Sequence, residues 1–315
     1  MMRKKLFFLA FFLAAYSAQT FAQGIYRFRV EEPWSFSLQG GPSQYFGDLY
    51  ALWQYQEGVQ PDFYTGVSAR YTFGTNLKAR GDFGFYQISG QDDLADPVSG
   101  RIPRNLNFRS RNWEAALIVE YYLKPVKVFN ITREFFNPYV FFGIGATTNN
   151  PHTLYNGKWV NLRPLRTENE YYNGIVTVFP MGLGLKYKAN VYMDLFIEGN
   201  YRFTFSDYLD DVSSYNISGF YEELIDDYLS GLDPDRLRLS IRQERFLLPN
   251  GEPNIELIRN TRGSARRGSG DPRLNEPDAR YDGYFTLNFG AEIYFSKDIW
   301  DNWIFRNRGR GFRFW

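Results

Sequence analysis

The segment Tyr192–Ser206, YMDLFIEGNYRFTFS, alternates apolar and polar residues almost without interruption. One side of this segment is apolar and rich in aromatic residues: Met193, Leu195, Ile197, Tyr201, Phe203 and Phe205. The other side is polar and carries several charges: Asp194, Glu198, Asn200, Arg202, Thr204 and Ser206. A period of two indicates a β-strand with two different faces. Because the apolar face is rich in large aromatic residues, we expect it to contact lipid while the charges face the inside of a barrel.

Seven further segments with strand patterning are predicted to be strands: Trp34–Gly40, Phe63–Phe73, Leu77–Ile88, Asn107–Leu123, Pro138–Thr147, Val176–Lys188 and Tyr284–Phe295. Short turns such as Gly74–Asn76 and Ala189–Asn190 alternate with longer connections. Short turns on one side and long loops on the other are typical of outer-membrane barrels, whose short turns are periplasmic. An even number of strands permits antiparallel closure, which leaves no unpaired strand edge in lipid.

The sequence therefore predicts an all-β fold, an eight-stranded antiparallel transmembrane β-barrel of OmpA/OmpX-like size, over residues 23–296. We expect it in the outer membrane, in contact with outer-membrane lipids and with both mature termini in the periplasm. Residues 1–22 are predicted to be a signal peptide, since a basic start precedes an apolar run and small residues that end at Ala22. That apolar run is too short to span a bilayer as a helix.

Composition excludes several classes of function. The chain contains no cysteine, so it has no disulfide framework, no thiol catalysis and no lipidated N-terminal cysteine. A net charge of +1 gives no electrostatic argument for a nucleic-acid partner, and we expect none.

Charged residues on the expected inward faces balance at six of each sign. The positive set is Arg70, Lys78, Arg80, Lys186, Lys188 and Arg202. The negative set is Asp82, Glu114, Glu120, Asp194, Glu198 and Glu292. Because an unpaired charge in a narrow lumen is costly, this balance predicts an interior ion-pair network. Inward glycines such as Gly182 and Gly184 are expected to make room for long side chains. Eight strands enclose only enough space for side chains, so we predict no conducting pore.

The segment Ser213–Arg280 is a large insertion, predicted to be a partly ordered extracellular loop with a short helix within Tyr221–Leu232. A cap that contacts a partner or cargo is the alternative. Residues 297–315 form a basic and aromatic tail, predicted to be periplasmic: it is either a docking peptide or a disordered end at the membrane interface. Candidate partner-binding residues lie in this tail and in the connection after the fourth predicted strand: Lys124, Lys127, Arg133, Trp300, Trp303, Arg306, Arg308, Arg310 and Trp315.

Few residues in the sequence suggest catalysis or metal binding. His152 is the only histidine, so a Ser–His–acid site would have to use it. Asp207, Asp210 and Asp211 could bind calcium at a loop rim, although their spacing is not that of an EF-hand, and turn-capping acids are the simpler interpretation. The sequence shows no Gly-rich phosphate loop and no clustered metal ligands. We therefore expect no catalytic, cofactor-binding or metal site.

An ordered set of motifs indicates a family. It comprises GPSQYFGDL at 41–49, NFRSRNWE at 107–114, PYVFFGIG at 138–145, NP at 150–151, GKW at 157–159, LRPLRTE at 162–168, PMGLG at 180–184 and TFSDYLDDVS at 204–213. Together these resemble the PorG-like barrels of the type IX secretion system. The resemblance implies a small outer-membrane barrel without catalysis. It also implies periplasmic association with a PorK-like lipoprotein and a PorN-like ring subunit, in support of protein secretion and gliding motility.

The expected function is therefore non-enzymatic: an outer-membrane barrel that anchors or scaffolds the type IX protein secretion machinery. Its periplasmic face would consist of Lys124–Asn137 and residues 297–315, because a filled barrel neither transports nor reacts. Two alternatives stay open. One is a surface-facing binding or adhesion barrel that acts through residues 213–280, and the other is a lipid-modifying enzyme that uses His152.

Overall fold

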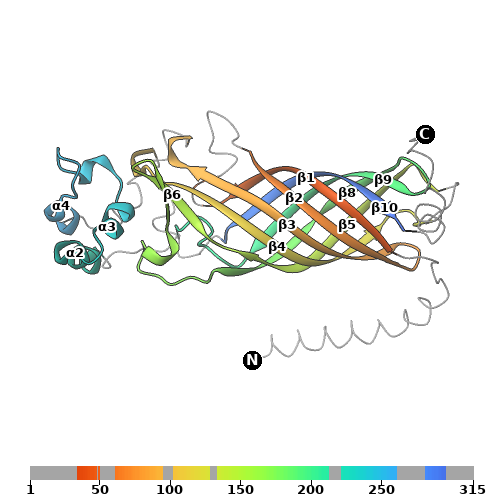
Figure 1. Ribbon diagram of the computed structural model, residues 1–315, viewed down its shortest axis with the longest axis horizontal. Coiled ribbons are helices and arrows are strands. Elements are labelled where there is room, and N and C mark those ends of the chain that lie inside the picture. The colour runs from red at the N-terminus through yellow and green to blue at the C-terminus, as the bar shows by residue number, and fades with distance from the viewer. Residues whose placement is uncertain are drawn as a thin grey trace, which may run out of the picture.

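The computed structural model describes residues 34–47, 49, 61–94, 102–127, 133–212, 221–260 and 281–295. Eight of its strands form a barrel (Figure 1): β1 (Trp34–Phe46), β2 (Asp62–Phe73), β3 (Leu77–Gln91), β4 (Asn107–Tyr122), β5 (Phe136–Thr148), β8 (Ile175–Lys188), β9 (Met193–Thr204) and β10 (Gly283–Tyr294). They pair in the order β3-β2-β1-β10-β9-β8-β5-β4, and the pairing of β3 with β4 closes the ring. All of these pairs are antiparallel. The predicted eight-stranded barrel is confirmed.

The two ends of the barrel differ. The turns Gly74–Asn76 and Ala189–Tyr192 lie at one end, together with the start of β1 and the end of β10. We call this the short-turn end, and we call the opposite one the loop end. At the loop end β3 and β4 continue together as far as the pair Gln91 and Asn107, so this hairpin projects beyond its neighbours (Figure 1).

One hairpin was not predicted. β6 (Pro151–Tyr155) and β7 (Lys158–Asn161) pair with each other, and β6 joins β4 where His152 faces Arg109. Residues Asn156 and Gly157 form its turn with φ angles of 49° and 75°. An Asn-Gly pair with positive φ at both positions is the preferred two-residue hairpin turn, so the sequence did contain a signal for it.

Along the barrel strands, exposed apolar residues alternate with buried polar ones, which is the reverse of the pattern in a water-soluble barrel. Leu38, Leu117 and Leu183 are 65%, 72% and 67% exposed on the outer face, whereas Arg70 and Arg202 are fully buried inside. Aromatic pairs lie on the outer face near both ends, such as Trp34 with Tyr71 and Phe85 with Trp113. An apolar outer band between two aromatic girdles is the surface of a barrel that is solvated by lipid.

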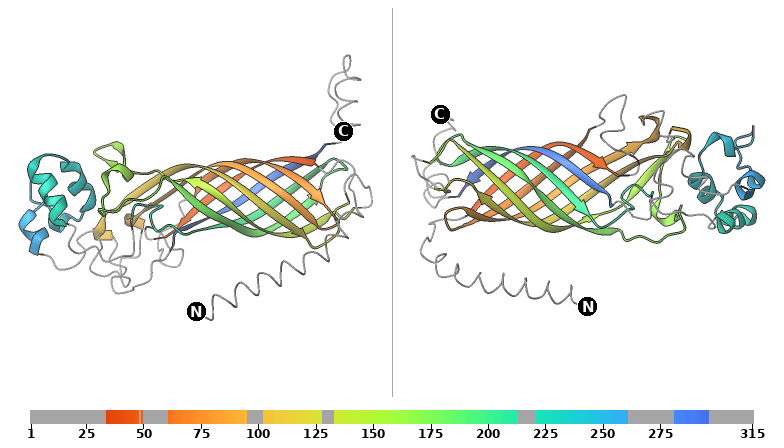
Figure 2. Two further views of the ribbon diagram at one scale, coloured as in Figure 1. Left: turned by 90° about the horizontal axis from the view of Figure 1, so that it is seen from below. Right: turned by 180° about the vertical axis from the view of Figure 1, so that it is seen from behind.

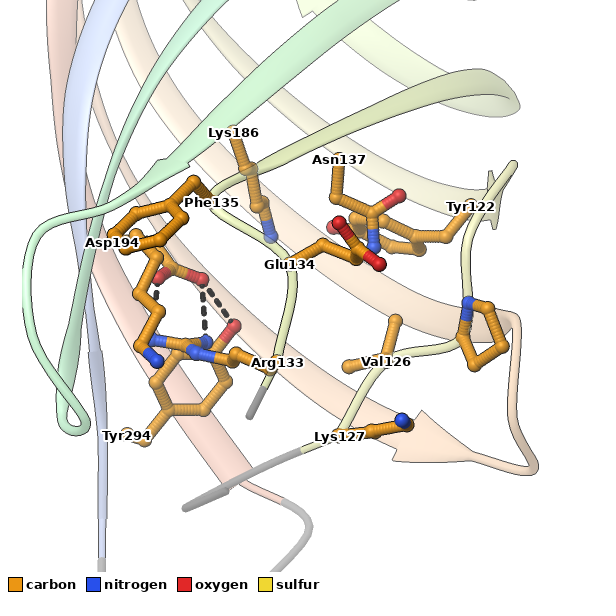
Figure 3. A pocket seen from close by; sticks show the side chains of 12 residues that line it. Tyr122, Val126, Lys127, Arg133, Glu134, Phe135, Asn137, Lys186, Asp194 and Tyr294 are labelled. Atoms are coloured by element: carbon orange, nitrogen blue, oxygen red, sulfur yellow. Dashed lines mark hydrogen bonds and ion pairs between the residues drawn. The ribbon is translucent and has the colours of Figure 1, made fainter. Parts of the chain in front are cut away.

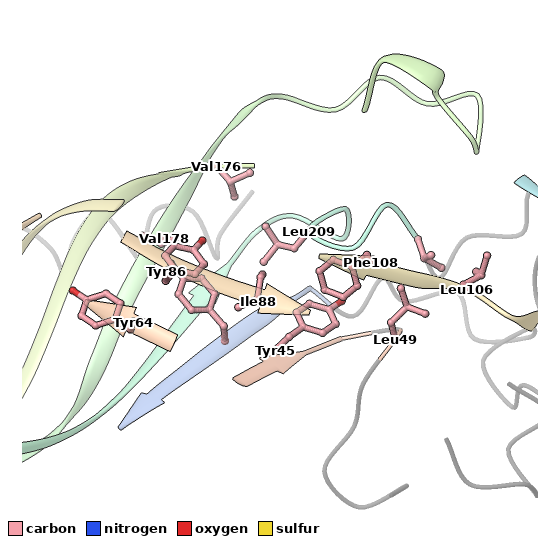
Figure 4. Close-up of a cluster of buried hydrophobic side chains, with 12 residues drawn as sticks. Tyr45, Leu49, Tyr64, Tyr86, Ile88, Leu106, Phe108, Val176, Val178 and Leu209 are labelled. Carbon is pink, nitrogen blue, oxygen red and sulfur yellow. The ribbon is translucent and has the colours of Figure 1, made fainter. Parts of the chain in front are cut away.

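A cluster of buried apolar and aromatic side chains fills the barrel toward the loop end (Figure 4): Tyr45, Leu49, Tyr64, Tyr86, Ile88, Leu106, Phe108, Val176, Val178, Leu209, Val212 and Tyr284. The rings of Tyr86 and Tyr284 stack with centroids 4.4 Å apart. The lumen therefore contains two layers, an apolar one at the loop end and a charged one below it.

Beyond the loop end lies a small group of helices, α2 (Tyr221–Ser230), α3 (Pro234–Ser240) and α4 (Ile255–Asn260), which Figure 2 shows from two sides. We call residues 221–260 the helical cap. It has its own core: Tyr221, Leu224, Ile225, Leu237, Ile241, Phe246 and Ile258. The start of α3 follows from its sequence, because the Asp233 carboxylate accepts a hydrogen bond from the backbone N–H of Arg236 and Pro234 occupies the first turn.

Four short 3₁₀ helices complete the described elements: Asp92–Leu94, Ile102–Arg104, Arg163–Leu165 and Glu244–Phe246. No helix in the part of the chain that the structure describes is long and apolar enough to cross a membrane. The predicted signal peptide 1–22, the tail 297–315 with Trp300, Trp303, Arg306, Arg308, Arg310 and Trp315, and two parts of the predicted loop (213–220 and 261–280) lie outside the described residues.

Candidate functional site

The middle of the lumen contains a network of buried ion pairs. Arg80 on β3 places Nη1 2.6 Å from Glu198 Oε2 on β9 and 2.8 Å from Glu120 Oε1 on β4. Arg70 on β2 donates from Nε to the same Glu120 oxygen at 2.9 Å. Asp82 lies beside Arg80, with Oδ1 3.0 Å from Nε. Each of these charged groups therefore lies next to a group of opposite charge.

Two further groups extend the network toward the ends. Toward the short-turn end, Glu292 on β10 accepts hydrogen bonds from Lys78, at 2.7 Å, and from Lys186. Toward the loop end, Arg202 on β9 pairs with Glu114 on β4 at 3.2 Å, and the Tyr284 hydroxyl also donates to Glu114. Both carboxylates are buried, so these contacts replace the water that each would otherwise bind.

Aromatic rings fill the space between the charges. The guanidinium carbon of Arg80 lies 4.9 Å from the ring centroid of Phe141, and Lys186 Nζ lies 4.9 Å from that of Tyr122. Tyr139 donates from its hydroxyl to Glu198 at 2.9 Å, and its ring occupies the position that a Cβ on Gly184 would need. The inward glycine at 184 therefore makes room for an aromatic ring rather than for a long charged side chain.

Arg133 closes the lumen at the short-turn end (Figure 3). It comes from the connection between β4 and β5 and places Nη2 2.6 Å from Asp194 Oδ1 on β9. It also donates to the Asn190 carbonyl at 2.7 Å and lies over the ring of Tyr294. The sequence predicts Arg133 on the partner-facing surface, but it is only 8% exposed and its guanidinium contacts groups inside the protein.

Lys188 is predicted to lie inside the lumen, but the structure places it outside the network. It is half-buried at the rim, with Nζ 5.7 Å from the ring centroid of Phe135, because β8 ends there. With Arg133 in place of Lys188, the network still balances at six charges of each sign. The positive members are Arg70, Lys78, Arg80, Arg133, Lys186 and Arg202. The negative members are Asp82, Glu114, Glu120, Asp194, Glu198 and Glu292.

The remaining candidates at the short-turn end are exposed. Lys124 pairs with Glu134 at 3.2 Å, and both side chains are about half exposed to solvent. Lys127 is also exposed, at the edge of a small cavity of about 20 Å³ bordered by Arg133 and Tyr294. These lysines are accessible at the short-turn end, whereas the cavity is too small for more than a water molecule.

The residues considered for chemistry take other roles. His152 lies on β6 with Nδ1 2.8 Å from the Asn150 carbonyl oxygen, so this nitrogen contacts backbone and not a carboxylate. Asp210 accepts hydrogen bonds from the backbone N–H groups of Leu49 and Val212, and Asp211 accepts from the hydroxyls of Thr167 and Tyr172. Within the described ranges, no three His, Cys, Asp or Glu side chains are grouped so that they could hold a metal ion.

The contacts that hold the helical cap against residues 153–169 were not predicted from the sequence. Arg236 donates from Nη2 to Asn169 Oδ1 at 2.6 Å, and Ser240 donates to the Thr167 carbonyl at 2.6 Å. Arg242 donates to Thr153 on β6 at 2.8 Å. Nothing in the local patterning marked these residues, since each contact joins segments about 70 to 90 residues apart in the chain.

Comparison with known proteins gives only distant similarity. No model of a protein family matches the chain, and no curated protein does. Among solved structures it is similar to Neisserial surface protein A, at 10% identity and a TM-score of 0.37, with 83% of this chain and 97% of that chain covered.

Two further solved structures give similar values. Ail of Yersinia pestis, in complex with the heparin analogue sucrose octasulfate, has 11% identity and a TM-score of 0.35, with 84% of this chain and all of that chain covered. The N-terminal β-barrel domain of Pseudomonas aeruginosa OprF has 11% identity and a TM-score of 0.33, with 83% and 97% covered. At such low scores the assignment of the fold rests on the strand pairing described above.

Proposed function

We propose that this protein is a non-enzymatic outer-membrane barrel that anchors or scaffolds the type IX protein secretion machinery through its periplasmic face. The observation that carries the proposal is the packed lumen, in which twelve buried charges neutralise one another between stacked rings. A barrel filled in this way offers neither a channel nor a reactive group, so its function lies at its exposed ends.

The short-turn end is assigned to the periplasm because short turns of outer-membrane barrels face that side. Lys124 and Lys127 lie exposed there, in the connection that also carries Arg133. The partners proposed for this end are a PorK-like lipoprotein and a PorN-like ring subunit, and outer-membrane lipids surround the wall. The ordered motifs between residues 41 and 213 support this choice of machinery by resemblance.

Two changes at the short-turn end test the proposal: charge reversal of Lys124 and Lys127 to Glu, and deletion of residues 297–315. Partners are recovered from gently solubilised outer membranes by affinity purification and identified by mass spectrometry, and secretion is measured in the same cells. We expect at least one change to reduce recovery of the periplasmic partners and secretion together. A chain without residues 221–260 is the control and should retain both. Unchanged recovery and secretion in both variants would refute this role.

A second candidate is binding at the cell surface through the helical cap. It is favoured by the cap's own apolar core and by its hydrogen bonds to residues 153–169, which hold it against the barrel as an ordered unit. Deletion of residues 213–280 that spares secretion but abolishes a surface interaction would support this candidate. Loss of secretion in the same variant would instead assign the insertion to the secretion role.

A further inference from the structure

The outer wall of the barrel contains an apolar groove near the loop end. It has a volume of about 460 Å³ and is formed by β1 to β4, with Leu38, Thr65, Val67, Phe83, Phe85 and Trp113 in its lining. Phe83 stacks on Trp113 with ring centroids 5.3 Å apart, so these rings form one wall of the groove. Since the groove lies within the apolar outer band, the matching occupant is a hydrocarbon chain.

A polar row lies next to this groove on the loop-end side. Trp113 pairs with Phe85 across β4 and β3, and two residues further on Arg111 pairs with Gln87. Arg111 donates from Nε to the Gln87 side chain at 2.8 Å, and Gln87 donates to Asp62 at 2.6 Å. Two residues along a strand correspond to about 7 Å. Arg111 therefore lies about 7 Å from the exposed ring of Trp113 on the loop-end side, at the level expected for a lipid headgroup.

A second arginine extends this row. Arg109 is on the same outer face of β4, and its guanidinium carbon lies 3.6 Å from the ring centroid of Trp159 on β7. It is close enough to Arg111 for their charges to interact. Among the described residues the Arg109 side chain donates no hydrogen bond and the Arg111 side chain donates only from Nε, which leaves the terminal nitrogens of both guanidinium groups available.

The local charge favours an anion. The carboxylate that interacts with Arg109 is Asp62, and its two oxygens accept hydrogen bonds from Gln87 and Ser89. Two guanidinium groups against one carboxylate leave a net charge of +1. Arginine presents a planar fork of N–H donors that matches phosphate oxygens bidentately, and stacking on Trp159 restricts the orientation of Arg109.

We propose that Arg109 and Arg111, together with the groove beneath them, form a binding site for a phosphorylated membrane lipid. Its phosphate contacts the two guanidinium groups, and one of its acyl chains lies in the groove against Trp113. The site is separate from the secretion role and from the helical cap. It gives this side of the barrel a fixed lipid at the rim where the wall meets the loop end.

The test uses native mass spectrometry of the full mature chain in detergent with two matched probes, dioleoyl phosphatidic acid and dioleoylglycerol, which differ only by the phosphate. We expect phosphatidic acid to bind at least about tenfold more tightly than dioleoylglycerol. The double substitution R109Q/R111Q should remove this preference without affecting the weak binding of dioleoylglycerol. Both arginines lie outside the lumen network, so the barrel should fold, and a heat-dependent gel shift checks this.

Three further measurements separate the components of the site. The control K124Q/K127Q also loses two cations, at the opposite end of the barrel, and should bind phosphatidic acid like the wild type. The substitution T65W fills the groove and should weaken binding of both probes. Millimolar inorganic phosphate should not displace the lipid. Three results would each overturn the proposal. The wild type and R109Q/R111Q could bind phosphatidic acid equally well, K124Q/K127Q could lose as much affinity as R109Q/R111Q, or inorganic phosphate alone could displace the lipid.

Discussion

Arg80 and Glu198 form an ion pair across the full width of the barrel, with Nη1 and Oε2 2.6 Å apart. Their strands, β3 and β9, are four places apart in either direction around the eight-stranded ring, so the two residues come from opposite walls. The pair therefore acts as a strut between strands that share no backbone hydrogen bonds.

Removing Arg80 should destabilise the barrel strongly. The substitution Arg80→Met keeps much of the side-chain volume but leaves Glu198 buried without its cation, and it removes one of the two arginines that contact Glu120. We expect the free energy of unfolding to fall by about 3–5 kcal/mol, the usual effect of breaking a buried pair. Urea unfolding in lipid vesicles, followed by tryptophan fluorescence, measures this change.

The matched control is the exposed pair of Lys124 and Glu134. Lys124→Met removes one cation of an ion pair in the same way, but water screens its partner, and the effect should stay below about 1 kcal/mol. Similar losses for Arg80→Met and Lys124→Met would contradict the strut.

Filling the space above Gly184 should also destabilise the barrel. A Cβ at this position would overlap the ring of Tyr139, so Gly184→Ala should cost about 1–3 kcal/mol. In a Tyr139→Leu background the same change should cost close to nothing, because the ring that causes the overlap is gone. Gly81→Ala is the control: its Cβ would lie 3.9 Å from its nearest neighbour, and stability should change by less than about 0.5 kcal/mol.

The packed lumen predicts that the barrel does not conduct ions. The apolar cluster around Tyr86 and Ile88 fills the lumen toward the loop end, and Arg133 closes the short-turn end through Asp194. Planar-bilayer recordings of the purified barrel should show no stable large conductance. Regular current steps that persist for the folded protein would refute the packed interior.

The contact between the helical cap and the loops depends on Arg236. Its guanidinium joins Asp227 on α2, at 2.7 Å, to Asn169, at 2.6 Å. In Arg236→Ala we expect amide hydrogen exchange in residues 163–172 to accelerate about 30-fold, equivalent to about 2 kcal/mol, while the barrel strands stay unchanged. Arg259→Ala removes only an exposed pair with Glu222 and should leave exchange in residues 163–172 as it is. Equal acceleration in both variants would argue against the tether.

The cap should loosen in acid through Glu252. Hydrogen bonds from Tyr228 and then Arg238 lower the pKa of this carboxyl below its usual value of 4.5. A lowered pKa in the folded state means that the contribution to stability is complete above about pH 4.5 and is lost as the pH falls through the lowered pKa. Limited proteolysis of the cap between pH 6 and pH 3 should show this step in the wild type. Glu252→Gln should lack it, and an identical step in this variant would assign the effect to other groups.

The alternation of residues within each strand predicted the barrel, because it shows which face of the strand contacts lipid and which faces the lumen. In Tyr192–Ser206 the lipid face and the lumen face are both visible from the alternation alone, since side chains of a strand point to opposite sides. The same period placed Arg80, Glu198 and Glu292 inside before any contact was known. The cap contacts of Arg236 carried no such signal, because their partners are distant in sequence and lie in irregular loops.

The sequence by itself determined the strands, their two faces, the closure into eight and a balanced set of interior charges, because these depend on local periodicity and on the requirement that backbone groups in lipid be paired. Only the tertiary structure decided which charges meet. It brought Arg133 from a connection into the lumen in place of Lys188, directed Arg80 across to Glu198, and placed the ring of Tyr139 over Gly184. These outcomes follow from barrel geometry and side-chain packing, which join residues from several strands that no local pattern connects.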